Sequence, residues 1–402
     1  MSIWNIIILT AMLQGFLLAL FLILNKKGNR TANFFLASLV FVFSIDIGLE
    51  TLYASPIIEN FTFLIGINDV IFFLYGPLLY FYAYFLTSTQ TVSIKRLLPH
   101  FFPFLLILIV YIPLLFLQEQ AFKLASEGLL PLPTFFEPDF FLKADVRGYV
   151  ELASGFHQLI YFGFTLILLK KHQETIKNSF SDIERINLSW LKILTFGTGM
   201  IVAIDVLLYF IVKTEFIAFD NAVLFISLLC SFLIYAIGYF GLMQPTIFSQ
   251  TSITISPQLT EYTNVIVSDT QPKYLKSTLT DEQSDEHKTR LLNLMKTEKL
   301  YLEGELKLSD VAEKLRISNN NLSQIINEKL EKNFYDFVND YRVETAKTLL
   351  LNPKKQHLTL LAIAFESGFN SKSSFNSVFK KQCGFTPTEF RKRRSFDTDS
   401  HG

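Results

Sequence analysis

The feature that most constrains this chain is a succession of apolar stretches long enough to cross a lipid bilayer. A helix needs about 20 apolar residues to span roughly 30 Å of hydrocarbon. Such stretches occupy residues 3–24, 33–52, 64–87, 99–117, 150–169, 190–212 and 220–243. The chain has 402 residues and is 50% hydrophobic, which is too apolar for an ordinary soluble protein, yet its last third is rich in charge. The sequence therefore predicts two parts that face different solvents.

The distribution of basic residues predicts the orientation of these spans. We interpret residues 3–24 as a retained span, the alternative being a signal peptide, because no basic segment precedes them and no small-residue cleavage site follows. Basic residues fall on alternate loops, near Lys26, Lys95 and Lys170. The positive-inside rule places those loops in the cytoplasm. We expect a multi-pass protein of the inner (cytoplasmic) membrane, with its N-terminus outside and everything after about residue 243 inside.

Some ionisable residues lie in the outer half of the predicted bundle. They are Asp46, Asp69, Asp205 and His157. Charged groups inside a bilayer are costly and usually face a bundle interior or a watery cavity, so one interpretation is a pocket for a signal ligand, open to the outside. The alternative is that they reach the membrane interface or make interhelical hydrogen bonds. Asp46 and Asp205 are the strongest pocket candidates because they lie deepest.

The composition changes after the last span, which predicts the domain boundaries. Residues 1–243 form the seven-span domain, and the Ser/Thr-rich residues 244–280 form a cytoplasmic linker without a clear period. Acidic residues from Asp281 onward then open a helical pattern, where carboxylates suit the positive end of the helix dipole. We expect a folded domain over 281–395 and a disordered tail over 396–402.

The pattern after residue 308 predicts a helix-turn-helix unit. Apolar residues at Leu308, Val311 and Leu315 define a first helix, and Ser309 and Ser318 are well placed as N-caps. The outer face of the next helix offers Asn320, Ser323 and Gln324, whose amide and hydroxyl groups suit base edges in the major groove of DNA. A polar outer face by itself is also typical of any surface helix.

A second helix-turn-helix pattern follows a longer amphipathic helix over 334–351. Residues 359–365 form its first helix, Gly368 permits the turn, and Ser371 caps the next helix. The outward residues of that helix are Lys372, Ser373, Ser377 and Lys380. Arg391 to Arg394 add positive charge in a further helix that begins near Pro387.

The charge of this second unit favours a polyanionic partner. Between His357 and Arg394, seven Lys and Arg side chains face two Glu side chains. A cationic surface of this kind binds phosphate with salt-dependent, sequence-independent affinity. Double-stranded DNA is the expected partner, and anionic lipid is the alternative.

The run IAFESGFNSKSSFNSVFKKQCGFTPTEFR, residues 363–391, resembles the signature of AraC/XylS-type transcription regulators. The resemblance extends over residues 286–394, the family's whole double helix-turn-helix domain. It implies two recognition helices, 319–328 and 371–381, that enter successive major grooves. By position, the implied base-facing residues are Asn320, Ser323, Gln324, Lys372, Ser373 and Ser377, with Lys380 and Arg391 as further DNA contacts. The first recognition helix departs from the family pattern in being Asn-rich and nearly uncharged.

The predicted architecture is all-α, a seven-helix transmembrane bundle followed by a cytoplasmic double helix-turn-helix domain. Its fusion of parts resembles membrane-bound bacterial regulators, so we expect a one-component regulator of transcription that responds to a signal at its bundle. Its expected partners are DNA, the lipid bilayer, a signal ligand and a second copy of the chain, because confinement to a membrane raises the effective concentration.

Three other functions were weighed against this one. A transporter or channel with a regulatory tail should show corresponding broken helices in its two halves, and these halves show none. An enzyme should show a catalytic motif, and the chain carries no HExxH, GxSxG or phosphate-cradling glycine loop. We expect no catalytic residues, metal or cofactor. A tethered regulator freed by proteolysis within residues 244–280 stays an alternative.

Overall fold

The protein is all-α over the residues that its structure describes, which confirms the predicted fold class. This computed structural model describes residues 3–26, 28–53, 66–88, 93–111, 146–184, 186–243 and 280–399, with 55, 57, 61 and 64. Within them, the only strand-like feature is an isolated bridge between Phe180 and Lys307. The chain divides into two compact units, residues 1–170 with 188–257 and residues 171–187 with 258–402. Each unit is described by itself.

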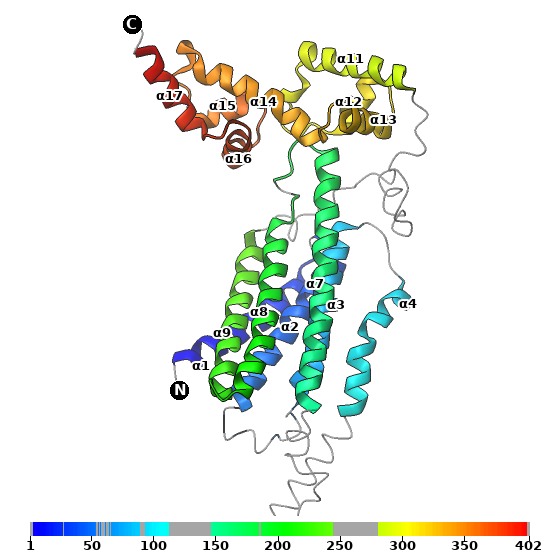
Figure 1. Ribbon diagram of the computed structural model, residues 1–402, viewed down its shortest axis with the longest axis vertical. Coiled ribbons are helices and arrows are strands. Elements are labelled where there is room, and N and C mark those ends of the chain that lie inside the picture. Colours follow the sequence, from blue (N-terminus) through cyan, green and yellow to red (C-terminus); the bar gives the residue numbers. More distant parts are fainter. Residues whose placement is uncertain are drawn as a thin grey trace, which may run out of the picture. The chain divides into compact units, whose positions relative to one another are not determined.

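The first unit is a bundle of long apolar helices (Figure 1). Among the described residues, seven helices are long and apolar enough to cross a membrane, and each overlaps one predicted span; residues 112–117 of the predicted span 99–117 lie outside the described residues. They are α1 (Ile3–Leu24), α2 (Arg30–Tyr53), α3 (Ile67–Thr87), the helical segment Ile94–Tyr111 that opens with α4 (Ile94–Leu97) and η3 (Leu98–Phe101), α7 (Val146–Ser179), α8 (Ser189–Lys213) and α9 (Phe219–Met243). The last residues of α7 belong to the second unit.

Small residues let helices of the bundle approach one another closely. A Cβ atom added at Gly76 of α3 would lie 2.8 Å from the Cβ atom of Tyr161 in α7. One added at Gly15 of α1 would lie 2.0 Å from the hydroxyl of Ser44 in α2. Side chains larger than hydrogen would therefore force these helix pairs apart, as is typical of helices that associate through van der Waals packing.

The second unit contains short helices in two similar groups. They are α11 (Asp281–Glu298), η5 (Leu300–Leu302), α12 (Leu308–Leu315), α13 (Asn319–Gln324), the π-helical η6 (Ile325–Lys329), α14 (Phe334–Leu351), η7 (Pro353–Lys355), α15 (Leu360–Glu366), α16 (Lys372–Cys383) and α17 (Pro387–Asp399). Helix α17 continues into the segment predicted to be a disordered tail. The rest of that tail, residues 400–402, and nearly all of the predicted linker lie outside the described residues.

Helix α14 lies between the two groups of helices (Figure 1), and its two halves belong to separate hydrophobic cores. Its first half contributes Phe337 and Val338 to a core that includes Val311 and Leu322. Its second half contributes Val343, Ala346 and Leu350 to a core that includes Ile363, Phe375 and Phe379. The predicted amphipathic helix is therefore a rod shared by the two helix-turn-helix groups.

Side-chain caps define where the short helices begin. Ser318 Oγ accepts a hydrogen bond from the Asn321 amide at 3.1 Å, as predicted, and Ser371 Oγ accepts one from the Ser374 amide at 3.0 Å. The prediction that Ser309 is a cap is wrong, because α12 begins at Leu308 and Asp310 Oδ2 binds the Lys307 amide at 2.9 Å instead. Each such cap contributes about 1 kcal/mol.

Candidate nucleic-acid interface and bundle cavity

The first helix-turn-helix consists of α12, a turn and α13. Leu308, Val311, Ala312 and Leu315 of α12 are buried, as their spacing predicts. The turn follows at Arg316, which has a left-handed backbone with a φ of 56°. The predicted recognition helix 319–328 is α13 followed by η6, a π-helical turn.

Polar side chains of α13 form hydrogen bonds with those of η6, within the same predicted recognition helix. Gln324 Nε2 donates to Glu328 Oε2 at 2.8 Å, and Asn327 Nδ2 donates to Ser323 Oγ at 3.1 Å. Asn320 is exposed. Of the three residues of this helix predicted to face bases, Ser323 and Gln324 are therefore hydrogen-bonded within the recognition helix.

The second helix-turn-helix consists of α15, the turn at Gly368 and α16. Gly368 has a φ of 88°, and a Cβ atom there would lie 2.3 Å from the Tyr301 carbonyl oxygen, so only glycine fits. Phe375, Val378 and Phe379 of α16 are buried. The predicted outward residues Lys372, Ser373, Ser377 and Lys380 are all exposed on the remaining face.

Arg391 makes an internal contact that the sequence did not predict. Its Nη1 and Nη2 atoms both donate to the Leu358 carbonyl, each at 3.2 Å, so this arginine holds the segment that precedes α15. The neighbouring Arg393 guanidinium lies 3.8 Å from the centre of the Phe385 ring. The structure therefore gives Arg391 a role within the domain, beside the DNA contact predicted from its charge.

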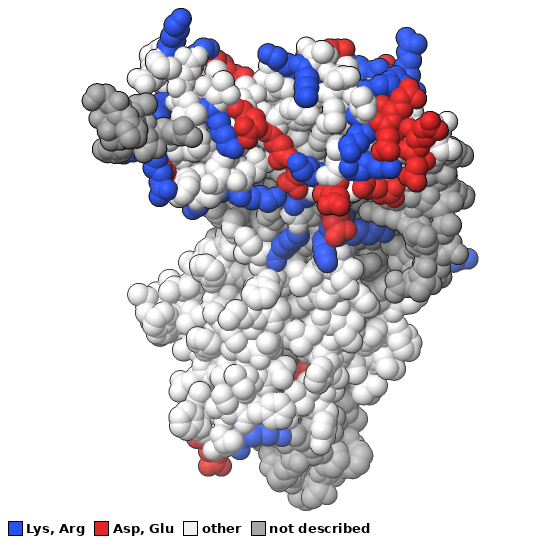
Figure 2. Space-filling model, turned by 45° about the horizontal axis from the view of Figure 1, so that its top comes forward, with Lys and Arg blue, Asp and Glu red and all other residues white. Residues whose placement is uncertain are grey.

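The two units differ in surface charge. Figure 2 shows Lys, Arg, Asp and Glu residues spread over the drawn face of the second unit, whereas the drawn face of the first unit is almost without them. In the second unit, Lys381 pairs with Asp336 at 3.0 Å and Lys329 pairs with Asp281 at 3.1 Å. Part of the positive charge is therefore neutralised inside the domain, while Lys372 and Lys380 are exposed on α16.

The first turn of α16 contacts residues 180–187, the segment that follows α7. Glu184 accepts hydrogen bonds from the hydroxyls of Ser371 and Ser373. Asn370 Nδ2 donates to Asp182 Oδ2 at 2.7 Å. Ser373 is one of the predicted base-facing residues. No sequence signal indicated these contacts, because the partners lie 187 to 189 positions apart.

A buried arginine connects the same segment to the helices of the second unit. Arg342 of α14 is 1% exposed. Its Nη2 atom donates to Ser181 Oγ at 2.9 Å and its Nε atom to the Tyr301 carbonyl at 2.8 Å. Burial lowers the pKa of this guanidinium to about 10, so it remains charged at neutral pH. The amphipathic pattern over 334–351 predicts a helix there but gives no indication of this role for Arg342.

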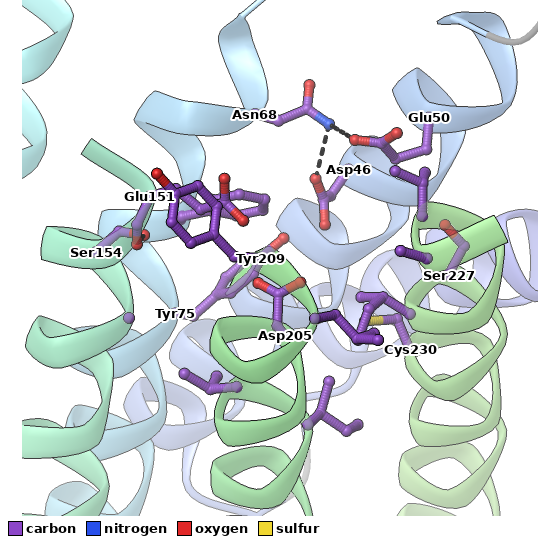
Figure 3. A pocket seen from close by; sticks show the side chains of 18 of the residues that line it. Asp46, Glu50, Asn68, Tyr75, Glu151, Ser154, Asp205, Tyr209, Ser227 and Cys230 are labelled. Carbon is purple, nitrogen blue, oxygen red and sulfur yellow. Dashed lines mark hydrogen bonds between the residues drawn. The ribbon is translucent and has the colours of Figure 1, made fainter. Parts of the chain in front are cut away.

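The first unit encloses a cavity of about 300 Å³ between α2, α3, α7, α8 and α9. Three of the four predicted pocket residues, Asp46, Asp69 and Asp205, line it together with Glu50 and Glu151 (Figure 3). The fourth, His157, does not belong to the lining. Its ring packs instead against the rings of Phe73 and Tyr161, with centroids 5.5 and 4.9 Å away.

The polar groups of the cavity are mostly acceptors. Asn68 Nδ2 donates to Asp46 Oδ1 at 3.1 Å and to Glu50 Oε1 at 2.7 Å, which ties two of the carboxylates together (Figure 3). Gln158 is 5% exposed and lines the cavity, and its Oε1 atom has no hydrogen-bond partner. Among the cationic side chains, Lys213 lies at the lining, 4.8 Å from the centre of the Tyr209 ring. The lining is therefore acidic, with hydrogen-bonding capacity left over.

Within the described residues, no group of three or more His, Cys, Asp or Glu side chains is arranged to hold a metal ion. Two carboxylates of the cavity, those of Asp46 and Glu50, share the Asn68 amide as a hydrogen-bond donor, and the other carboxylates of the lining face the same open volume.

Comparison with known proteins agrees with the carboxyl-terminal geometry. Residues 311–393 match the model of a helix-turn-helix domain family. A transcriptional regulator of the HTH type from Bacillus subtilis is 27% identical over 144 residues, which are 36% of this chain and 46% of that protein. The Msm operon regulatory protein of Streptococcus mutans is 30% identical over 87 residues, 22% of this chain and 30% of that protein. An HTH-type transcriptional regulator of Staphylococcus aureus is 33% identical over 101 residues, 25% of this chain and 13% of that protein.

The chain thus spans less than half the length of these curated relatives. No solved structure matches it.

Proposed function

We propose that this protein is a membrane-embedded, one-component transcriptional regulator that binds specific double-stranded DNA, because residues 311–393 match a helix-turn-helix domain family and residues 363–391 resemble the AraC/XylS signature. The observation that carries the proposal is the pair of helix-turn-helix groups on the shared helix α14. Each group presents one recognition helix, α13 or α16, with polar side chains on its outer face. Such a pair suits two major-groove contacts on one duplex.

Selection from randomised DNA tests this function. The full chain, purified in detergent micelles, is incubated with a pool of randomised duplexes, and bound duplexes are amplified and sequenced over a series of salt concentrations. We expect one motif with two half-sites to be enriched, and its advantage over bulk DNA to persist as salt weakens phosphate contacts. Enrichment of no motif at any salt concentration would contradict specific binding.

Membrane embedding is supported by the outward surface of the bundle. Large apolar side chains are widely exposed there, including Phe232 at 71% and Ile109 at 67%. Such side chains are stable against lipid and costly in water. Residues 171–187, which are the end of α7 and the segment that leads from it to α8, belong to the same compact unit as the DNA-binding domain, which suits the proposed cytoplasmic side for both. A reporter that works only in the cytoplasm should therefore be active when it is fused after residue 243. A reporter that works only outside the cytoplasm should be inactive at the same position.

We place the signal at the acidic cavity of the bundle. Asp46, Asp205 and the unpartnered Gln158 Oε1 atom offer acceptors, while the rings of Tyr75 and Phe72 line the remaining wall. Carboxylates and aromatic faces both favour a positively charged ligand. The cavity of about 300 Å³ is at the lower end of the range for small-molecule sites. A small organic ammonium compound is the ligand class that this lining fits.

Matched compounds test that assignment. The thermal stability of the full chain is measured with a panel of small organic ammonium compounds and with carboxylates of the same sizes. We expect stabilisation by some of the ammonium compounds, by none of the carboxylates, and loss of that stabilisation in Asp46→Asn and Asp205→Asn. Stabilisation that survives in both variants would mean that the signal site lies elsewhere. That outcome would not contradict the proposed binding of DNA.

A further inference from the structure

Residues 180–184 are held by the DNA-binding domain through their backbone and their side chains. The Ser181 amide donates to the Leu306 carbonyl at 3.1 Å, next to the bridge between Phe180 and Lys307. Ser181 and Ile183 are buried, at 1% and 9% exposure. A loop that merely connected α7 to α8 would have no reason to bury these residues among the helices of another domain.

The main attachment of this segment is Arg342. Its Nη1 atom donates to the Ser181 carbonyl at 3.1 Å and its Nη2 atom to Ser181 Oγ at 2.9 Å. The same guanidinium donates to the carbonyls of Tyr301 and Glu303, each at 2.8 Å. A buried guanidinium needs acceptors for its whole donor fork, and Ser181 supplies two of them.

The acidic side chains of the segment lie on the DNA-facing end of α16. Asp182 accepts from Asn370, while Glu184 accepts from Ser371 and Ser373. The first turn of a recognition helix is the part that reaches base edges. A carboxylate at this place occupies the hydroxyls that would bind DNA and repels the phosphates that would approach them.

We infer that residues 180–184 are a docking segment that binds the hydroxyl and amide groups at the start of α16 through Asp182 and Glu184, and that competes with DNA for them. The partner of this surface is a loop of the chain itself. The inference rests on the proposed DNA-binding function and adds the step that controls it: DNA binds tightly only when the docking segment has left α16.

Helix α7 connects this segment to the cavity. It carries the cavity-lining residues Glu151, Ser154 and Gln158 near its start, and the docking segment follows its last residue, Ser179. Its 34 residues make it about 51 Å long, well beyond the roughly 30 Å of a bilayer core. A shift of α7 that follows from ligand binding therefore moves the docking segment directly, without the linker over 244–280.

The expected change in DNA affinity follows from the fraction of molecules in which the docking segment has left α16. Apparent DNA affinity equals the intrinsic affinity multiplied by the fraction of molecules whose α16 is uncovered. Hydrogen bonds to a charged group typically shift such an equilibrium by about tenfold or more. Removing the negative charge of Glu184 should therefore tighten DNA binding by about tenfold.

The first experiment compares charge-neutral variants of the full chain. Binding of the selected duplex is measured by fluorescence anisotropy for the wild type, Glu184→Gln, Ser181→Ala and a control, Glu282→Gln. The control removes the same charge from an exposed position on α11. We expect about tenfold tighter binding for Glu184→Gln, several-fold for Ser181→Ala and less than twofold for the control.

Ser181→Ala separates docking from simple electrostatics, because it changes no charge and removes a hydroxyl that accepts a hydrogen bond from Arg342. Tighter binding by this variant means that loosening the segment uncovers α16. Equal affinity for the wild type, Glu184→Gln and Ser181→Ala would overturn the inference, while specific binding by all of them would leave the proposed function intact. Absence of specific binding in every variant, including the wild type, would instead contradict the proposed function.

A covalent closure gives the opposite readout. The native Cys230 and Cys383 are first replaced by Ser. Asp182→Cys and Asn370→Cys then place two thiols where Asp182 Oδ2 and Asn370 Nδ2 lie 2.7 Å apart, and a short bis-maleimide joins them. We expect the joined protein to bind the duplex at least tenfold more weakly than either single-cysteine variant treated in the same way. Unchanged affinity after complete cross-linking would show that DNA and the docking segment do not compete.

Discussion

The two helix-turn-helix groups share one motif but differ in what holds their recognition helices. In the first group, the side chains of α13 and η6 bind one another, through the pairs Ser323–Asn327 and Gln324–Glu328. In the second group, α16 exposes Lys372 and Lys380, and its first turn is covered by Glu184. The polar side chains of the first recognition helix therefore have hydrogen-bond partners within that helix. Those in the first turn of α16 have partners in a distant part of the chain.

The difference indicates a division of labour between the groups. A helix with amide side chains and few cations contributes hydrogen bonds to base edges more than attraction to phosphate. A basic helix contributes salt-dependent affinity, and it is the one whose exposure the docking segment changes. Control of the second group is thus control of affinity, while the first group supplies sequence preference.

The largest expected effect comes from Arg342, which lies between the two cores. Arg342→Ala leaves the Tyr301 carbonyl without its donor, removes one of the two donors to the Glu303 carbonyl, and should cost about 3–5 kcal/mol of unfolding free energy. Hydrogen exchange of the full chain, read at the amides of α14 and α16, measures this loss. Arg290→Ala is the control, because Arg290 is exposed and its hydrogen bonds go to the Leu315 carbonyl and the nearby His287 ring, and it should cost less than about 1 kcal/mol. Similar losses for the two variants would show that the groups do not depend on the buried arginine.

The turn of the second group should be next in sensitivity. Gly368→Ala combines left-handed strain of about 1–2 kcal/mol with overpacking of about 1–3 kcal/mol against the Tyr301 carbonyl. Gly384→Ala is the matched control, since its φ of 78° brings the same strain and nothing lies within 4 Å of the added Cβ atom. Thermal unfolding followed at α15 and α16 should rank the two variants in that order. Equal destabilisation would mean that the close approach to Tyr301 relaxes without cost.

DNA binding by single variants tests the division of labour itself. Asn320→Ala should cost about 1–3 kcal/mol on the selected duplex and relax the preference at one base pair, with an unchanged salt dependence. Lys372→Ala and Lys380→Ala should weaken binding to all duplexes and reduce the slope of log affinity against log salt by about 1 each. Anisotropy titrations over a salt series measure both quantities. A steep fall in salt dependence for Asn320→Ala would contradict the separation of roles.

The smallest expected effect is a pH dependence that joins the two groups. Burial raises the pKa of the Asp336 carboxyl, but hydrogen bonds from Lys381 and Asn333 outweigh it and leave the pKa below its ordinary value. The stabilisation is therefore present above about pH 4 and is lost as the pH falls through the lower, folded-state pKa. For a partly exposed pair it should amount to about 1 kcal/mol or less. Unfolding between pH 2 and 7 should depend less on pH in Asp336→Asn, and Lys381→Met should remove part of the same dependence.

Much of the fold was readable from local patterns. Apolar stretches predicted all seven long helices, and apolar spacing predicted the buried faces of α12 and α16. Three of the four residues predicted to form a pocket do line the cavity, because an ionisable group in an apolar helix turns inward whatever its neighbours are. His157 escaped that rule because an imidazole ring also packs well against aromatic rings.

The sequence by itself determined which segments become helices, which faces they bury and where the basic recognition helix lies, since those properties depend on residues a few positions apart. Only the tertiary structure decided that Arg391 holds the Leu358 carbonyl, that Arg342 binds Ser181 and that Glu184 covers α16. Hydrogen bonds between groups so far apart along the chain leave no periodic trace, because they depend on how finished helices pack and not on how each helix forms.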